Sequence, residues 1–391
     1  MMPNPAHAPV TFSPEGSAFP APITGAPPPL PEAALRPVPF TFTGSAGEYF
    51  RIWIVNVCLT ILTLGIYSAW AKVRRQRYLY RSTLLAGSPF DYHADPRRIL
   101  KGRLFVFLFL VIAAAFNAAV PELQFITQIL FFAIIPWLIV RSQIFNLANS
   151  SYHNLRFHFH PDYRGSYRVY LVEGILSMVT GGLLTPLFVC RSKQFFFRNC
   201  HFGRTPARFT GSCKRFFRIL LVNPLLLALL GFLFVYLSSQ LLALLGTDPT
   251  QGEVGPDTGG GFGFPPFLPL FGGSGWVFSF LVVWSTLAFG MVEAWVINHI
   301  WSHVELGRHR FRSTLNPFGM AWIRLTNTVA TLVTLGLLTP WARIRLIRYR
   351  LAALVLLVPP GEEAFLAAVG REDPSALSEE LGSFMDADFG L

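Results

Sequence analysis

Four long apolar stretches constrain the fold of this 391-residue chain more than any other feature. Each looks long enough to cross the hydrocarbon core of a bilayer, which takes roughly 20 apolar residues. Backbone groups in lipid must find their hydrogen-bond partners within the chain, so such segments form helices or closed barrels. The alternating segments of a membrane β-barrel are missing here. We therefore predict four spanning helices, at residues 104–120, 123–140, 219–245 and 276–301.

The composition agrees with a membrane domain flanked by two tails. Hydrophobic residues make up 52% of the chain and charged residues only 14%. Residues 1–39 hold twelve prolines and lack the apolar core of a signal peptide, so we predict a disordered tail. Residues 359–391 hold eight acidic residues and one Arg, which predicts a second, acidic disordered tail. The membrane domain is then 40–358, with a Gly/Pro-rich loop at 246–275 that we expect in the periplasm.

One phrase occurs three times, at residues 56–74, 173–191 and 327–345. Each copy has an apolar helix, a Gly suited to a helix end with positive φ, and a basic second helix suited to lipid headgroups. The apolar helix has about a dozen residues, or about 18 Å, and a hydrocarbon core is about 30 Å thick. We predict re-entrant or interfacial elements within repeats at about 40–92, 157–209 and 311–358; a seven-span bundle is the alternative.

Positive charge predicts the topology. Lys and Arg gather in five clusters, and the 246–275 loop has none. If only four segments span, all the clusters lie on one side, and that side is cytoplasmic by the positive-inside rule. We predict a multi-pass protein of the bacterial inner membrane with both termini in the cytoplasm. Its predicted fold is all-α, with four spanning helices and three re-entrant or interfacial helix–Gly–helix repeats. Aromatic stretches predict short cytoplasmic strands at 40–44, 90–93, 156–160 and 208–211.

Each repeat helix carries a polar stripe at positions i, i+4 and i+7, which share one helical face. Such residues either hydrogen-bond between membrane helices or line a hydrated path. Glu293, like Glu173 in the second stripe, is a carboxylate in an apolar segment and a candidate proton or cation site, unless protonation or pairing with a basic loop residue neutralises it. The stripes are Asn56, Thr60 and Thr63; Glu173, Ser177 and Thr180; and Asn327, Thr331 and Thr334.

The basic second helices point to anionic lipid rather than nucleic acid as the partner. Each Lys or Arg near a membrane surface contributes about 1 kcal/mol of attraction to anionic headgroups. The candidate headgroup-binding residues are Lys72, Arg74, Arg75, Arg77, Arg343 and Arg345.

No cofactor, metal or catalytic residue is predicted. The sequence has no phosphate loop, GxSxG or HExxH. His299 and His303 are four apart and could face one metal ion, but the only candidate third ligands are Glu305 and His309, which favours interface histidines over a metal site. The four cysteines include no CxxC pair and are predicted to be reduced and structural.

Several motifs resemble those of the YjgN-like bacterial inner-membrane proteins, a family of unknown function. They are Phe42-Thr-Gly44, Glu48-Tyr49-Phe50, the first copy of the repeated phrase, Arg77-Tyr78 and Phe90-Asp-Tyr92. The resemblance implies a multi-pass inner-membrane protein and supplies no substrate or site residues. The second copy departs from the pattern, with Glu173 in place of Asn and Leu187 in place of Trp, so a common role for all three copies does not follow.

Two hypotheses of function remain open at this stage. The first is a transporter or channel for a small solute or ion, with the polar stripes as its path. The second is a non-catalytic structural protein that organises anionic lipid. An enzyme embedded in the membrane is a more distant third.

Overall fold

The structure is a computed structural model that describes residues 35–153, 155–203, 205–244 and 275–360. The described residues form five units, each built as a strand, a helical hairpin and a second strand. The strands are short, and each forms one part of the wall of a barrel that all five units share. They are β1 Arg36–Phe42, β2 Thr83–Leu85, β3 Ser88–Tyr92, β4 Ser150–Tyr152, β5 Leu155–Phe159, β6 Cys200–Phe202, β7 Thr205–Phe209, β8 Val304–Leu306, β9 His309–Ser313 and β10 Leu354–Val358.

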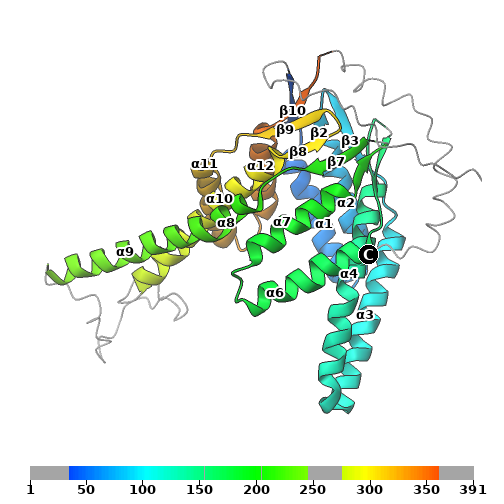
Figure 1. Ribbon diagram of the computed structural model, residues 1–391, viewed down its shortest axis with the longest axis horizontal. Coiled ribbons are helices and arrows are strands. Elements are labelled where there is room, and N and C mark those ends of the chain that lie inside the picture. Colours follow the sequence, from blue (N-terminus) through cyan, green and yellow to red (C-terminus); the bar gives the residue numbers. More distant parts are fainter. Residues whose placement is uncertain (1–34, 154, 204, 245–274, 361–391) are drawn as a thin grey trace, which may run out of the picture.

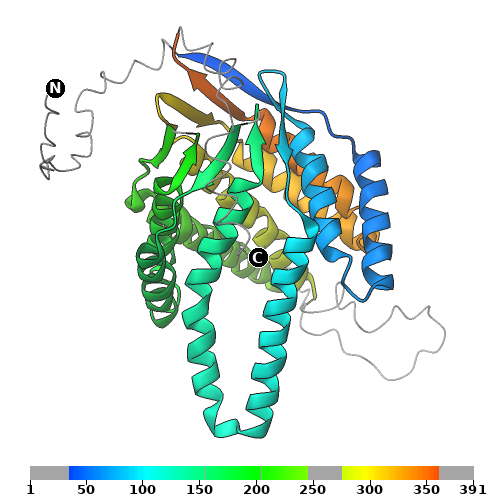
Figure 2. The same cartoon turned by 90° about the vertical axis from the view of Figure 1, so that its right-hand side faces the viewer.

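The ten strands close into an antiparallel barrel in the order β1-β10-β9-β8-β7-β6-β5-β4-β3-β2. Tight turns join consecutive units, and each begins at a residue of positive φ: Ala86 (50°), His153 (51°), Gly203 (55°) and Gly307 (59°). The first and last strands pair with each other, Arg36 opposite Val358, and this pairing closes the ring. The two ends of the described chain therefore leave the barrel side by side (Figure 2).

One backbone hydrogen bond recurs in every unit. The donor is the backbone N–H of the third residue before the first helix. The acceptor is a backbone carbonyl just after the second helix. The five bonds are Thr43 N to Ser82 O (2.9 Å), His93 N to Asn149 O (2.8 Å), His160 N to Asn199 O (2.8 Å), Thr210 N to His303 O (2.9 Å) and Thr314 N to Ala353 O (3.0 Å). The repetition therefore includes the two units with long apolar hairpins, whose sequences do not carry the repeated phrase.

The interior of the barrel is a packed apolar core. The Phe40 ring lies 6.3 Å from Phe90 and 6.4 Å from Phe311 on other strands, and Phe157 lies 4.8 Å from Phe202. Buried aliphatic side chains of β2 and β10 complete this cluster. Side chains from around the ring thus fill its centre, as they do in other narrow barrels.

The helices project from the barrel as hairpins that fan out in different directions (Figure 1). In the third and fourth units the first helix runs through wider turns, η3 and η4. The helices are α1 Ala46–Leu62, α2 Ser68–Arg81, α3 Pro96–Ala119, α4 Gln124–Ala148, α5 Tyr163–Ser166, η3 Tyr167–Glu173, α6 Gly174–Val179, α7 Thr185–Arg198, α8 Cys213–Phe217, η4 Arg218–Val222, α9 Asn223–Leu244, α10 Gly275–Trp301, α11 Pro317–Val333 and α12 Thr339–Ala352; η2 Pro121–Leu123 turns between α3 and α4.

Four helical segments are long and apolar enough to cross a membrane. They overlap the four stretches expected from the sequence, and only 11% of an apolar 18-residue window of each is buried within the protein. Apolar side chains exposed over such lengths require a lipid environment. The segments are Pro96–Ala119, Pro121–Ala148, Cys213–Leu241 and Ser279–Trp301.

The three copies of the repeated phrase form the shorter hairpins, α1/α2, α6/α7 and α11/α12. The helix ends expected at Gly65, Gly182 and Gly336 are confirmed, with φ of 92°, 87° and 91°. Glycine adopts this left-handed conformation without the steric strain that a Cβ atom causes. The preceding residues Leu64 and Leu335 are each 95% exposed, so these hairpins end on apolar tips.

The prediction of an all-α protein is wrong, because the ten strands close into a barrel. The four aromatic stretches do lie in β1, β3, β5 and β7, but their partners were missed. Four of those partners, β2, β4, β6 and β8, are only three residues long. Three residues are too few to show the period-two pattern by which strands are recognised. The Gly/Pro-rich loop and both predicted tails fall outside the described residues, apart from their edges.

Candidate functional site

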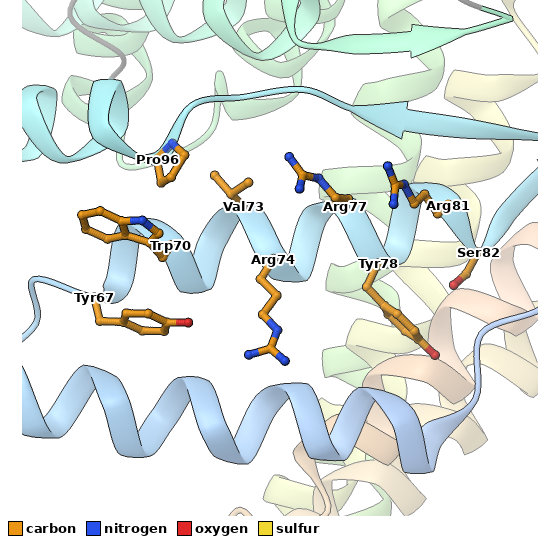
Figure 3. A pocket seen from close by; sticks show the side chains of 9 residues that line it. All are labelled: Tyr67, Trp70, Val73, Arg74, Arg77, Tyr78, Arg81, Ser82 and Pro96. Carbon is orange, nitrogen blue, oxygen red and sulfur yellow. The ribbon is translucent and has the colours of Figure 1, made fainter.

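The basic helix α2 has a hollow on each of two sides. The first, here called the Trp70 hollow, has a volume of about 580 Å³. Its lining includes three aromatic and three Arg side chains, and Tyr67 stacks on Trp70 at 6.2 Å. Figure 3 shows Arg74 pointing into the space beside α1, whereas Arg77 and Arg81 leave the helix on another side.

Two of the three Arg side chains of the Trp70 hollow have protein partners. Arg81 makes two hydrogen bonds to the Asp91 carboxylate, at 3.1 and 3.2 Å. The Arg77 Nε donates to the carbonyl of Tyr92 at 3.4 Å. Arg74 has no such partner among the described residues, so its guanidinium remains available to an anion.

The second space, here called the Asn56 cavity, has a volume of about 360 Å³ and lies between α1, α2 and α3. Its polar lining consists of three cations, hydroxyl groups and one amide, and no carboxylate lines it. Apolar side chains of α1 form the remaining wall. The polar residues are Tyr49, Asn56 and Thr60 from α1, Ser68, Lys72 and Arg75 from α2, and Arg103 from α3.

The cations of the Asn56 cavity repel one another and are partly buried. Burial lowers the pKa of Lys72, and the charges of Arg103 and Arg75 lower it further. Burial also lowers the pKa of Arg75, with Arg343 of α12 as the next cause. The Arg75 Nε is buried without a hydrogen-bond partner. Positive charges that converge on a space without a carboxylate in its lining are an arrangement suited to binding an anion.

Asn56 differs from its equivalent in the third copy, whereas Glu173 in the second copy also has a buried oxygen, Oε2, without a hydrogen-bond partner. In the third copy, Asn327 donates to Ala342 O at 3.0 Å and accepts from the Arg345 guanidinium at 3.2 Å. In the second copy, burial raises the pKa of Glu173 against the opposing pull of Arg191 and Arg168, which belong to the same unit. Asn56 is only 7% exposed, yet its Oδ1 has no partner.

Most of the other stripe residues form hydrogen bonds within their own hairpins. The Oγ1 atoms of Thr63, Thr180 and Thr334 accept hydrogen bonds from the backbone N–H groups of residues 67, 184 and 338, at 2.9, 3.3 and 3.1 Å, just before the second helix. They therefore fix the turn between the two helices. Three more make local bonds: Thr60 to Asn56 O, Thr331 to Asn327 O, and Ser177 with Thr185.

Glu293 forms an ion-pair clamp between three helices. Its carboxylate accepts from the Arg324 Nε at 2.7 Å and Nη2 at 2.6 Å, and it also accepts from the Arg350 guanidinium. These bonds join α10 to α11 and α12. Sequence reasoning allowed for a basic partner but did not identify these two. The only signal was an unmatched charge in an apolar segment.

The predicted headgroup residues divide into three groups. Lys72 and Arg75 line the Asn56 cavity, with Arg343 acting on Arg75 from α12. Arg74 and Arg77 line the Trp70 hollow on the other side of α2. Arg345 bonds Asn327 and also Thr326 Oγ1, at 2.6 Å, and lies 5.2 Å from the Trp341 ring.

Sequence reasoning missed Arg103 and Tyr49 as cavity residues. Arg103 donates to Ser68 Oγ at 2.5 Å, which ties α3 to α2 beside the cavity. Its only sequence signal is that it is the last cation before the apolar stretch at 104–120. Burial raises the pKa of Tyr49, against the opposing effect of the Arg343 and Arg75 charges.

Two of the four cysteines are joined to each other. Cys190 and Cys213 form a disulfide between α7 and α8, so the prediction that all four cysteines are reduced is wrong. The sulfur atoms come from different units, a proximity that the sequence does not reveal. Within the described residues no group of three or more His, Cys, Asp or Glu side chains could hold a metal ion.

Comparisons with known proteins agree with the membrane assignment. The chain is 27% identical to the inner membrane protein YjgN of Salmonella typhimurium (strain LT2), over 79% of this chain and 85% of that protein. It is 30% identical to the inner membrane protein YjgN of Escherichia coli K12, over 38% of this chain and 37% of that protein.

No solved structure matches the chain. Residues 37–384 match a family described as a bacterial protein of unknown function, DUF898, which covers most of the chain. The protein therefore belongs to the DUF898 family, together with the inner membrane proteins named YjgN.

Proposed function

We propose that this is a multi-pass inner-membrane protein that binds anionic phospholipid headgroups with its basic helices. The observation that carries the proposal is helix α2, which lies between two cationic spaces and next to the spanning segment Pro96–Ala119. A basic, aromatic helix beside a membrane span lies where anionic headgroups concentrate. The relatives named inner membrane proteins support this location.

The arrangement of the hairpins supports a cytoplasmic barrel. Both long hairpins leave the barrel and return to it, and β1 pairs with β10, so the two ends of the described chain lie on one side. The short hairpins end on exposed apolar tips, which supports contact between these tips and the membrane. Basic residues near the barrel then face the cytoplasm under the positive-inside rule. The turn at Pro121–Leu123, at the far end of α3 and α4, faces the periplasm in this proposal (Figure 2).

This topology predicts opposite labelling of two new cysteines. Gly47, beside the barrel, has open space around its Cα, and Glu122, at the tip of the α3/α4 hairpin, is exposed. In a Cys58→Ser background, we expect a membrane-impermeant thiol reagent to label Glu122→Cys in intact cells and Gly47→Cys only in inverted vesicles. Labelling of both from the same side would contradict the proposed topology.

The transport hypothesis has less support from these observations. The interior of the barrel is filled by side chains, so its axis is not an open conduit. Most stripe residues are occupied by hydrogen bonds within single hairpins, and these bonds do not join the three stripes. Helix–helix and turn stabilisation accounts for them.

We expect Arg74→Gln combined with Arg77→Gln to weaken the binding of anionic phospholipid by roughly 30-fold, because each surface charge contributes about 1 kcal/mol and 1.4 kcal/mol is a factor of ten. Binding of phosphatidylcholine should not change. The measurement is native mass spectrometry of the full chain in detergent, titrated with each lipid.

The matched control removes two positive charges from residues outside both spaces. Arg164 and Arg208 are exposed and line neither space, so Arg164→Gln with Arg208→Gln should bind anionic lipid as the wild type does. Equal loss in the two double variants, or equal wild-type affinity for anionic and zwitterionic lipid, would overturn the proposed function.

A further inference from the structure

We propose that the Asn56 cavity is a specific site for one phospholipid whose headgroup carries both a phosphate diester and a hydroxyl group, as phosphatidylglycerol does. This inference rests on the proposed function and adds selectivity to it. General attraction of a basic helix discriminates by charge alone. The Asn56 cavity adds a buried polar group that discriminates between headgroups of equal charge.

The cations of the cavity provide the part of the site that binds the phosphate group of the ligand. Lys72, Arg75 and Arg103 come from two helices and converge on a space of about 360 Å³ without a carboxylate in its lining. The buried Arg75 Nε has no partner, so one donor is already desolvated and unused. A phosphate oxygen is a suitable acceptor for it, because guanidinium and ammonium groups form short, charge-assisted hydrogen bonds to phosphate.

The amide of Asn56 provides the part of the site that binds the hydroxyl group of the ligand. Asn56 is 7% exposed, lines the cavity, and leaves its Oδ1 without a donor. A buried acceptor without a partner is unfavourable, and a ligand hydroxyl would satisfy it. A phosphate diester without a hydroxyl has only acceptors to offer this atom.

Comparison with the third copy shows why this site lies in the first unit rather than in the fifth. The equivalent Asn327 is satisfied by Arg345 and by a backbone carbonyl, so a side chain of the protein already fills that position. Position 345 corresponds to Arg74, which in the first unit lines the Trp70 hollow instead. The first copy therefore keeps open a position that the third copy closes.

The location of the cavity favours a lipid over a soluble phosphate ester. Arg103 lies in the candidate span Pro96–Ala119, and the next residue, Leu104, is 62% exposed. Ile61, which also lines the cavity, is 69% exposed. The mouth of the site thus adjoins apolar surface on α1 and α3, against which acyl chains can lie once the headgroup has bound.

The test compares two lipids with the same charge. Phosphatidylglycerol and phosphatidylmethanol are both phosphate diesters with one negative charge, and only phosphatidylglycerol has headgroup hydroxyls. We expect the wild-type full chain to bind phosphatidylglycerol roughly fivefold more tightly, the size of one net hydrogen bond. Asn56→Leu should remove this preference and retain binding of both lipids. Native mass spectrometry with each lipid gives the two affinities.

Asn327→Leu is the matched control, because it removes the same amide from the position that the protein fills itself. It should keep the preference for phosphatidylglycerol. Lys72→Gln with Arg75→Gln should weaken both lipids together. The wild-type comparison requires no substitution, so a variant that fails to fold does not block the test.

Each outcome separates the two proposals. Equal wild-type affinity for the two anionic lipids, both above phosphatidylcholine, would overturn the specific site and leave the proposed function standing. Equal affinity for all three lipids would overturn both. Displacement of bound phosphatidylglycerol by millimolar glycerol 1-phosphate would show that the cavity takes a soluble phosphate ester, which would overturn the assignment to a lipid.

Discussion

Replacing Glu293 by Gln is expected to lower the stability of the folded protein by about 3 kcal/mol, which is the lower end of the range for removing one partner of a buried ion pair. The Glu293 side chain is only 17% exposed and is the shared acceptor for Arg324 and Arg350. Without the carboxylate charge, two partly buried guanidinium groups face each other and α10 loses its link to α11 and α12. Thermal unfolding in detergent, followed by intrinsic fluorescence, measures the effect.

Glu305→Gln is the control for this substitution. Glu305 pairs with Arg310 at 3.3 Å, but both side chains are about one-third exposed, at 31% and 37%. Exposed pairs contribute at most about 1 kcal/mol, so the control should unfold close to the wild type. Replacing Glu293, Arg324 and Arg350 together by Met should recover much of the loss, because no charge is then left unpaired. Wild-type unfolding of Glu293→Gln would contradict the clamp.

Replacing Gly290 by Ala is expected to destabilise the protein by about 1–3 kcal/mol, as overpacking of a tight core does. A Cβ atom at Gly290 would lie 2.6 Å from the Cα and 3.0 Å from the N of Ala321. Both contacts are to backbone, so α10 and α11 must move apart to admit one methyl group. Small residues at such crossings allow membrane helices to approach closely. The measurement is again thermal unfolding in detergent.

Gly47→Ala is the matched control for Gly290→Ala. Gly47 lies in α1, and a Cβ atom there would meet nothing within 4 Å. Ala is favoured over Gly in a helix by roughly 0.5–1 kcal/mol, so this variant should be as stable as the wild type or more so. If both Gly→Ala variants are equally stable, the close contact between α10 and α11 is not the tight fit described above.

The candidate site was only partly visible in the sequence. Lys72 and Arg75 stood out because a run of cations follows an apolar helix, and that pattern is local. The prediction did not separate them from Arg74 and Arg77, which line the opposite side of α2. Arg103 was missed because it joins the cavity from the next unit, and no spacing along the chain encodes that proximity.

The open amide of Asn56 also depended on tertiary structure. The sequence shows Asn at the same position in the first and third copies and does not distinguish the two. In the folded chain Arg345 turns back to Asn327, whereas its equivalent Arg74 lines another space. Whether this Arg side chain bonds the Asn or lies elsewhere depends on the residues packed around it in the folded chain. The repeated phrase does not include those residues.

The sequence by itself determined the membrane environment, the four apolar segments and the ends of the repeat helices. Hydrophobic length and the positive φ of Gly65 and Gly336 are properties of short segments, so they can be recognised before folding. Tertiary structure alone decided the barrel and the Glu293 clamp. Three-residue strands carry no periodic signal, and the clamp joins residues 31 and 57 positions apart. Such contacts form between neighbouring units, so they depend on residues that are distant in the sequence being brought together by folding.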